Sequence, residues 1–321
     1  MPKLPVKRSL GFAPAPALTD VLTSAASYAA DEKSANTRRA YRSDWLQFHT
    51  WCESVTAVSL PAQPATIAGY LAHLADAGLA ASTISRRLAA IAYAHKLKGH
   101  EPPTSAESVR IVLRGIRRRI GTKVEHKAPA TAAAIVGMLE QLPDTLTGCR
   151  DRALLLIGFA AALRRSELVD LKVNDAEPHK HGLLLHIRHS KTDQEGEGAA
   201  IPVPHGTRLK PVAALRAWLD RARITQGFIF RSIDRHGNIS KTGLSDRSVA
   251  DIVKRHAQAA GLDPELFAGH SLRAGFVTQA LEDGADLLKV MGITRHKRVE
   301  NVKIYDRRAQ AFIKHAGEGF L

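Results

Sequence analysis

The sequence predicts a mainly α-helical protein of two domains, with a small antiparallel β-sheet in the C-terminal domain. Its 321 residues exceed one typical domain, and a hydrophobic content of 45% suffices for two ordinary cores. Apolar residues recur at helical spacing through residues 18–120. The period shortens to that of strands within residues 183–203, on both sides of a glycine-containing turn. We therefore expect an all-helical N-terminal domain followed by an α+β domain.

The N-terminal domain is expected to follow a tail. Residues 1–17 are rich in Pro and Lys and lack periodicity, which predicts a flexible tail, and the first helix should start near Leu18. A second helix should begin after Ser34, its N-cap, and end at Cys52. Its apolar stripe repeats at intervals of three and four residues and consists of Tyr41, Trp45, Phe48 and Cys52.

Three more helices are expected to complete this domain, which we place at residues 18–121. Prolines at positions 61 and 64 break the preceding helix, and residues 65–77 form the next one, which ends at Gly78. Ser82 should cap the following helix, and residues 105–120 should form the last. The apolar stripe of the helix after Ser82 consists of Ile84, Leu88, Ile91 and His95.

Positive charge is concentrated in the N-terminal part of the chain. Up to residue 128 there are 18 basic and 9 acidic residues, so this part holds more than half of the net charge of +15. A basic helix face is often merely solvated. Several such faces, with a pI near 10.1, favour DNA as the partner. The arginines expected to contact DNA are Arg38, Arg42, Arg86, Arg87, Arg117, Arg118 and Arg119.

The second domain is expected at residues 131–321, after a linker at residues 122–130 that contains Pro129 and mixed charge. Two helices should open the domain, and helical spacing returns from residue 208 onward. The predicted elements are helices at 131–141 and 151–161, a strand at 183–189, a turn at 192–198, a returning strand at 199–203 and a short extended piece at 228–231.

Composition argues against several other classes of protein. No apolar run approaches the roughly 20 residues of a membrane span, and the Pro-rich start lacks the apolar core of a signal peptide. We therefore expect a cytoplasmic, nucleoid-associated protein without a membrane partner. Cys52 and Cys149 belong to no disulfide or zinc pattern, and His179 and His181 fit a solvated loop. No metal and no other cofactor is expected.

Six side chains along the second domain suit phosphoryl transfer. A tyrosine phenol, with an ordinary pKa of about 10, attacks phosphate poorly unless cations stabilise the phosphate and a neighbour takes its proton. Arginine forks match phosphate oxygens, and histidine or lysine can move protons. Each residue alone could be structural, as an ion pair, a turn lysine, a core histidine or a helix tyrosine. In chain order the six are Arg164, Lys191, His270, Arg273, His296 and Tyr305.

The ordered set and its flanks closely resemble the tyrosine recombinase, or phage integrase, family. Residues 269–275, Gly-His-Ser-Leu-Arg-Ala-Gly, are similar to that family's His-x-x-Arg box. The nine-residue step from His296 to Tyr305 is similar to its closing segment. Residues 36–45 resemble the opening of its core-binding domain. The resemblance spans residues 18–315 and is nearest to the Cre-like, two-domain members.

This resemblance implies a SAM-like core-binding domain, a catalytic domain and a site-specific DNA recombinase that needs neither metal nor ATP. The implied partners are double-stranded DNA recombination sites. Four identical protomers would pair two sites and exchange strands through a Holliday junction, whereas the protein off DNA would be a monomer or weak dimer. The amphipathic segment at residues 309–316 is expected to form a helix that docks on a neighbouring protomer.

The resemblance also implies the role of each site residue. Tyr305 attacks the phosphate to give a 3′-phosphotyrosyl bond, His270 accepts the tyrosine proton, and Lys191 protonates the leaving 5′-oxygen. The phosphate contacts are assigned to Arg164, Arg273 and His296, with Glu167 as a supporting residue.

One position departs from the family pattern, which usually has glycine before the second histidine. Arg295 stands there, and its side chain either contacts phosphate or alters the loop that carries His296. Two other functions compete with recombination: a type IB topoisomerase, which would relax any supercoiled plasmid, and a non-catalytic DNA-binding regulator, which would tolerate loss of Tyr305. The six residue types and the match of the N-terminal domain favour the recombinase.

Overall fold

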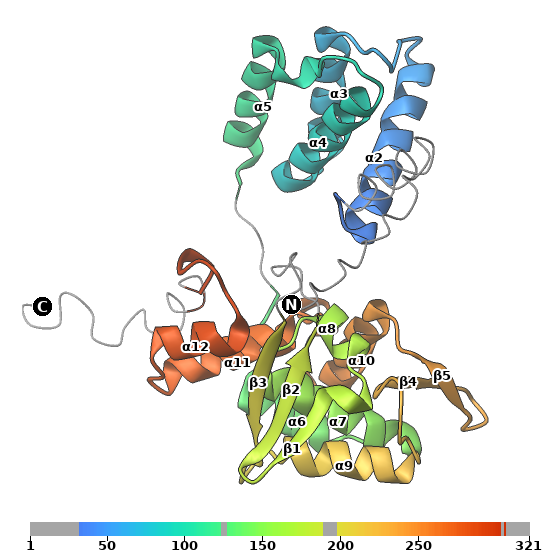
Figure 1. Ribbon diagram of the computed structural model, residues 1–321. Coiled ribbons are helices and arrows are strands. Elements are labelled where there is room, and N and C mark those ends of the chain that lie inside the picture. Colours follow the sequence, from blue (N-terminus) through green and yellow to red (C-terminus); the bar gives the residue numbers. More distant parts are fainter. Residues whose placement is uncertain (1–31, 123–126, 189–197, 303–304, 306–321) are drawn as a thin grey trace, which may run out of the picture. The chain divides into compact units, whose positions relative to one another are not determined.

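The structure confirms a mainly helical fold with a small antiparallel sheet. This computed structural model describes residues 32–122, 127–188, 198–302 and 305. The chain divides into two compact units, Met1–Val124 and Glu125–Leu321, each of which is described by itself. The described part of unit 1 is helical, and unit 2 combines helices with antiparallel strands (Figure 1). Four predicted segments lie wholly or mostly outside the described residues: the tail at 1–17, the helix that starts near Leu18, the turn at 192–198 and the helix at 309–316.

Unit 1 packs its helices around one apolar core. Its elements are α2 (Ala35–Ser54), α3 (Pro64–Asp76), α4 (Ala81–Leu97), the 3₁₀ turn η1 (Pro103–Ser105) and α5 (Glu107–Ile120). Ser34 caps α2 as predicted, since its side chain accepts a hydrogen bond from the backbone N–H of Thr37. Phe48 and Cys52, on the predicted stripe, are buried against Tyr70 and its neighbours. The periodicity of α2 therefore reports its core-facing side.

The helix α4 begins before its predicted cap. Ala81 is buried and already helical, and the carbonyl of Ala80 accepts the first helical hydrogen bond, from Ile84. No side chain caps this end. The prediction that Ser82 is the N-cap is wrong, because burial of Ala81 in the core extends the helix through the serine.

Unit 2 contains all the strands of the described residues, together with the predicted catalytic residues. Its elements in chain order are α6 (Ala132–Glu140), α7 (Leu146–Ala160), α8 (Arg165–Asp170), η2 (Val173–Asp175), β1 (Ala176–His179), β2 (Gly182–Ile187), β3 (Ala199–Pro204), α9 (Pro211–Arg221), β4 (Arg231–Ile233), β5 (Ile239–Gly243), α10 (Asp246–Ala259), η3 (Pro264–Leu266), α11 (Ser271–Glu282) and α12 (Leu287–Thr294).

The helix α7 lies in the core of unit 2 and is buried along almost its whole length. It begins at Leu146, whereas the sequence predicted a start at Asp151. The side chain of Thr145 accepts from the Gly148 N–H at 3.1 Å, and Gly148 has no room for a Cβ beside the carbonyl of Pro143. The predicted start is wrong because this capped turn precedes the apolar part of the helix.

The three-stranded sheet has the order β1-β2-β3 and is antiparallel throughout. Leu183 pairs with Val203 and Leu185 with Ile201, and all four are buried. The strand β3 contacts α7 and α9, which Figure 1 shows beneath the sheet. The predicted strands β2 and β3 are confirmed. The strand β1 and the hairpin β4-β5 were not predicted, although the extended piece at 228–231 reaches the start of β4.

The residues just before α6 are hydrogen-bonded to the segment that leads into α11. The backbone N–H of Ala128 donates to the carbonyl of Leu266 at 2.7 Å, and that of Ala130 to the carbonyl of Ser271 at 2.9 Å. Gly275 on α11 has no room for a Cβ beside the carbonyl of Ala130. This close packing of backbone on backbone fixes the start of α11, which carries two of the predicted site residues.

Candidate active site

Arg164 and Glu167 lie where α8 begins. Arg164 is the N-cap residue, and Glu167 is the third residue of the helix. One carboxylate oxygen of Glu167 accepts from the backbone N–H of Arg164 at 2.8 Å, and the other accepts from its guanidinium at 2.7 Å. Glu167 is buried, so these bonds form in a medium of low polarity. The predicted supporting residue therefore holds both the backbone and the side chain of Arg164.

Arg273 lies in the first turn of α11 and links three segments of unit 2. Its Nη1 donates to the carbonyl of Ala162 at 2.8 Å, and its Nη2 donates to the carbonyl of Thr294 and to Nε2 of His296, the latter at 3.2 Å. Burial, followed by the charge of Arg164, lowers the pKa of Arg273 to about 9. The guanidinium still carries its charge at neutral pH.

His296 follows α12 and is held in one neutral form. Thr294 donates its hydroxyl to the carbonyl of Val290 at 2.7 Å, so its oxygen accepts the proton on Nδ1 of His296, 2.8 Å away. That leaves Nε2 as the acceptor for Arg273. Burial, and then the charge of Arg273, lower the pKa of His296 to about 4. The ring is therefore neutral at pH 7.

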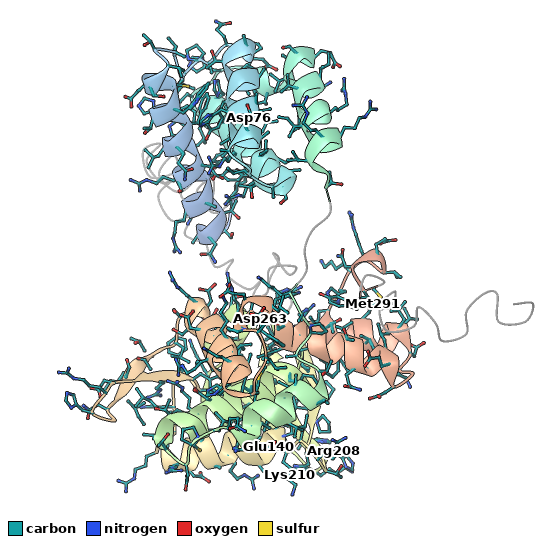
Figure 2. The ribbon with its side chains drawn as sticks, turned by 180° about the vertical axis from the view of Figure 1, so that it is seen from behind. Asp76, Glu140, Arg208, Lys210, Asp263 and Met291 are labelled. Atoms are coloured by element: carbon teal, nitrogen blue, oxygen red, sulfur yellow. The ribbon has the colours of Figure 1, made fainter. Side chains whose placement is uncertain are left out.

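Tyr305 lies in a helical turn near α11 and α12. It packs on the small apolar cluster of Val277, Leu281, Val290 and Val302, to which Met291, labelled in Figure 2, also contributes. Its hydroxyl lies 3.3 Å from Nε2 of His270, the N-cap residue of α11. Burial raises the pKa of Tyr305, and the charge of Arg273 opposes this. The phenol is thus protonated at neutral pH and faces a group that can take the proton.

Arg295 ends α12 in the left-handed conformation, with φ 56° and ψ 42°. Its Nη2 donates to the Glu167 oxygen that also bonds the backbone of Arg164, at 2.7 Å. Burial acts to raise the pKa of Glu167, but the charge of Arg295 and the hydrogen bonds from Arg164 outweigh it and lower that pKa. The residue that departs from the family pattern is therefore part of the cluster.

The structure brings together five of the six predicted catalytic residues, and Glu167, the predicted supporting residue, contacts Arg164. The five are Arg164, His270, Arg273, His296 and Tyr305. Lys191 lies outside the described residues, on the connection between β2 and β3. Sequence reasoning missed Thr294, whose hydroxyl two residues before His296 was the signal for a residue that fixes the imidazole. It also missed the carbonyl of Ala162, which no side-chain pattern can reveal.

The arginines predicted to contact DNA divide into two groups. Most are exposed on unit 1, and Arg117 donates to the side chain of Ser85 at 3.0 Å. Arg87 differs, because it donates to the hydroxyl of Tyr70 at 3.0 Å and lies 3.9 Å from the buried Asp44. A buried carboxylate and a phenol hold Arg87 inward, so it is less exposed than the other arginines of this predicted set. The exposed group is Arg38, Arg42, Arg86, Arg117, Arg118 and Arg119.

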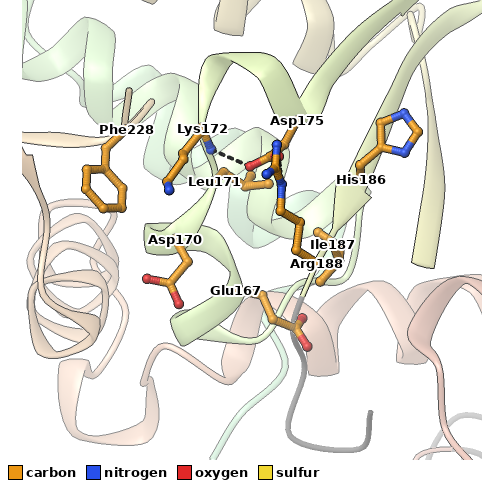
Figure 3. A pocket seen from close by; sticks show the side chains of 9 residues that line it. All are labelled: Glu167, Asp170, Leu171, Lys172, Asp175, His186, Ile187, Arg188 and Phe228. Atoms are coloured by element: carbon orange, nitrogen blue, oxygen red, sulfur yellow. Dashed lines mark hydrogen bonds and ion pairs between the residues drawn. The ribbon is translucent and has the colours of Figure 1, made fainter. Parts of the chain in front are cut away.

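A hollow of about 320 Å³ lies beside Glu167 (Figure 3). Asp175 in its wall accepts from the backbone N–H of Lys172 at 2.9 Å and pairs with Arg188 at 2.6 Å. The ammonium of Lys172 lies 5.5 Å from the ring centre of Phe228. Arg188 thus neutralises Asp175 in this wall, and we assign the hollow no ligand.

Within the described ranges of the chain, no group of three or more His, Cys, Asp or Glu side chains could hold a metal ion. Both cysteines are free thiols, and burial raises the pKa of each. A search of the described helices finds none that is long and apolar enough to cross a membrane.

A helical unit ahead of a mixed unit that gathers arginines, histidines and a tyrosine is the arrangement of a tyrosine-type site-specific recombinase. Two family descriptions match the chain: the phage integrase family over residues 130–311, and the phage integrase N-terminal SAM-like domain over residues 27–101. The chain therefore belongs to the phage integrase family of tyrosine recombinases.

Relatives of known name support the same assignment over most of the chain. An integrase/recombinase xerD homolog of Selenomonas ruminantium is 40% identical over 290 residues, which cover 88% of this chain and 85% of that protein. A tyrosine recombinase of Synechococcus elongatus is 31% identical over 304 residues, with 88% of each chain covered. The chain is thus a XerD-like enzyme of DNA recombination.

Solved structures share the fold at low sequence identity. The XerH site-specific recombinase bound to a palindromic difH substrate, in a post-cleavage complex, has a TM-score of 0.65 and 18% identity, covering 87% of this chain and 78% of that one. A lambda integrase dimer bound to a COC′ core site has a TM-score of 0.59 and 18% identity, covering 90% and 95%. These likenesses establish the fold.

Proposed function

We propose that this recombinase cuts and rejoins DNA through a covalent bond between Tyr305 and a 3′-phosphate, without metal or ATP. The observation that carries the proposal is the convergence of separate segments of unit 2 on one point. The Tyr305 hydroxyl lies 3.3 Å from His270, and α11 also carries Arg273, whose guanidinium reaches His296 and the turn before Arg164. A nucleophile, a proton acceptor and fixed cations are the parts that such a reaction needs.

The arginines would bind the phosphate. A phosphodiester under attack gains negative charge on its non-bridging oxygens, and guanidinium forks match that geometry. Arg164, oriented by Glu167, and Arg273, anchored on the Ala162 carbonyl, supply fixed positive charge at one place. Charge neutralisation by guanidinium groups leaves no need for a divalent ion, so we expect activity in EDTA.

Proton transfers would be divided between two residues. As the Tyr305 oxygen bonds to phosphorus, the bond to the 5′-oxygen breaks, and the phenol proton passes to Nε2 of His270. Lys191 would give a proton to the leaving 5′-oxygen. In the joining step a 5′-hydroxyl attacks the phosphotyrosine and the same transfers run backwards, so the energy of the phosphodiester is conserved without ATP.

His296 would contact the phosphate only with a proton on Nε2. Thr294 holds the Nδ1 proton, and Nε2 accepts from Arg273, so the neutral ring cannot donate there. Negative charge on the phosphorane favours the imidazolium, which donates from both nitrogens. We infer that His296 supports Arg273 before DNA binds and becomes a donor to phosphate as charge develops.

The expected partners are double-stranded recombination sites, and two solved proteins of this fold are bound to a palindromic difH substrate and to a COC′ core site. The exposed arginines of unit 1 would contact the duplex backbone. A helical core-binding domain at 18–121, a linker at 122–130 and a catalytic domain at 131–321 would act together. Four protomers on two paired sites would exchange strands through a Holliday junction, with the segment after Tyr305 docking on a neighbour.

The test is covalent trapping on a suicide substrate. Purified protein is incubated in EDTA with nicked duplexes built from the DNA that flanks its gene, and the products are separated on a denaturing gel. We expect a protein-DNA adduct that Tyr305→Phe lacks, while both proteins bind the duplex equally. An adduct formed by Tyr305→Phe would contradict the proposal.

The same preparation separates the recombinase from a topoisomerase. Supercoiled plasmid without the recombination site should stay supercoiled, whereas plasmid with paired sites should give recombinant products. Relaxation of any plasmid would favour the topoisomerase instead. DNA binding without an adduct on any flanking duplex would favour a non-catalytic regulator.

A further inference from the structure

Arg295 adds a third guanidinium to the cluster, at a position where the family usually has glycine. It reaches from the end of α12 to Glu167 on α8, with Nη2 2.7 Å from the carboxylate. We propose that Arg295 binds the DNA phosphate together with Arg164 and Arg273. This inference rests on the proposed function, since it names a further residue for the same phosphate.

The backbone at this position favours glycine. Arg295 has φ 56° and ψ 42°, a left-handed conformation in which an L side chain crowds its own carbonyl and glycine does not. A glycine there would close α12 without strain. The chain therefore keeps an arginine against a local conformational cost, which indicates that the side chain has a role.

Glu167 accepts a hydrogen bond of the same length from each of two guanidinium groups. One carboxylate oxygen lies 2.7 Å from Nη1 of Arg164, and the other lies 2.7 Å from Nη2 of Arg295. The two side chains also have similar exposed fractions, 17% for Arg164 and 13% for Arg295. Arg295 is thus placed like the arginine that the family assigns to phosphate.

Two donor atoms of Arg295 remain unsatisfied among the described residues. Its Nε and Nη1 are buried and have no hydrogen-bond partner there. Buried charged donors are unfavourable when unpaired, and the oxygens of a phosphate are their natural acceptors. With Nη2 bound to the carboxylate, the N–H groups of Nε and Nη1, which lie on different edges of the guanidinium, are the donors left for a second anion.

Charge balance also favours an anion at this point. Arg164, Arg273 and Arg295 surround Glu167, so the four side chains sum to an excess of two positive charges. Arg295 is not needed to neutralise Glu167, because both carboxylate oxygens already accept hydrogen bonds from the backbone and side chain of Arg164. A phosphorane with two negative charges offsets the excess, and the third fork would act most strongly in the transition state.

The experiment measures cleavage of the suicide substrate at saturating protein by three variants. Arg295→Gly restores the family residue, Arg295→Gln removes the charge and the fork but keeps a polar side chain, and Arg295→Lys keeps the charge without the fork. Arg247→Gln, on an exposed side chain of α10, is the control for loss of one positive charge. We expect the Gly and Gln variants to cleave on the order of 10²-fold more slowly, and the Lys variant to lose less.

A second substrate separates phosphate contact from a structural role. A methylphosphonate at the scissile position replaces one charged oxygen by methyl, so the deficit of Arg295→Gly should shrink several-fold on it. Affinity for the duplex should stay within a few-fold, and the melting temperature should be unchanged or higher, because the backbone strain is gone. Equal cleavage by Arg295→Gly and wild type, or equal losses on both substrates, would overturn the inference.

The remaining outcomes are also decisive. If Arg295→Gly does not fold, Arg295→Lys decides, because a lysine that cleaves at the wild-type rate shows that the fork is not used. Absence of an adduct with the wild-type protein would instead refute the proposed function and not the role of Arg295 alone.

Discussion

Each unit of this recombinase has a buried carboxylate beside two arginines, Asp44 in unit 1 and Glu167 in unit 2, and the two arrangements differ in how well the carboxylate is satisfied. In unit 1, Asp44 accepts from Arg86 at 3.2 Å, and its second oxygen has no hydrogen-bond partner among the described residues. In unit 2, both oxygens of Glu167 accept bonds of 2.7 to 2.8 Å from Arg164 and Arg295. The same residue types thus make a loosely paired charge and a tightly held one.

The difference appears in the two carboxyl pKa values. Burial raises the pKa of Asp44, and the charges of Arg86 and Arg87 do not compensate. The pKa of Glu167 is lowered, because donors outweigh burial. A well-satisfied buried carboxylate can fix the direction of two guanidinium groups, whereas an under-satisfied one cannot. Tight pairing around Glu167 is what a preorganised phosphate site requires.

The largest contrast should come from neutralising each carboxylate in turn. Glu167→Gln leaves two partly buried arginines without their anion, so we expect a loss of roughly 3 to 5 kcal/mol in the free energy of unfolding. Cleavage of the suicide substrate should fall by about 10²-fold or more, because Arg164 loses its orientation. Denaturant titration and single-turnover cleavage measure the two effects.

Asp44→Asn is the matched control. It removes a charge that burial already disfavours, so the free energy of unfolding should change by no more than about 1 kcal/mol. Its cleavage rate at saturating DNA should equal that of the wild type. Equal effects of the two substitutions on stability and cleavage would contradict the difference that the geometry indicates.

Local sequence predicted those parts of the fold that depend on neighbours along the chain. Ser34 caps α2 because its hydroxyl accepts a hydrogen bond from an N–H three residues on. The apolar residues of β2 and β3 lie at the positions that alternate between buried and more exposed. The strand β1 was invisible, because Glu177, Pro178 and His179 are exposed and gain strand structure only by pairing with β2. The residues of a strand do not by themselves reveal which other strand it will pair with.

The site was predictable as a set of residue types but not as a set of contacts. Arg164 and Glu167 are three residues apart, so their bond follows from helix geometry. The bond from Arg295 to Glu167 spans 128 positions and depends on how α12 packs. Sequence neighbours can also differ: Arg86 and Arg87 are adjacent on α4, yet Arg86 is exposed and Arg87 is largely buried. Tertiary packing decides which of two adjacent arginines meets solvent.

Acid should affect the two units differently. Glu167 and Asp151 have lowered folded-state pKa values; for Asp151, burial is opposed by His256 and Arg150. Such groups contribute stability that is complete above their unfolded values and is lost as pH falls through the folded ones. Asp44, with a raised pKa, has the opposite sign, because its protonation in the folded state relieves a buried charge.

We therefore expect unit 2 to lose protection before unit 1 as the pH falls below about 4.5, the ordinary range of carboxyl groups. Hydrogen exchange followed by mass spectrometry reads peptides of α7 and α8 separately from those of α2 and α4. The Glu167→Gln protein should show a smaller further loss on acidification. Earlier acid opening of α2 and α4 would contradict the assignment of the two carboxylates.

The smallest expected effects come from the two arginines beside Asp44, and they should be of different kinds. Arg87 bonds Tyr70 at 3.0 Å and has only 15% of its side chain exposed, so Arg87→Gln should lower the free energy of unfolding by about 1 to 3 kcal/mol. Arg86 is 47% exposed, so Arg86→Gln should leave stability within about 0.5 kcal/mol. If Arg86 contacts a phosphate, its loss should weaken binding at all sequences alike and reduce the slope of log affinity against log salt by about one. Binding isotherms at several salt concentrations test this, and an unchanged slope would restrict the DNA contacts of unit 1 to its other exposed arginines.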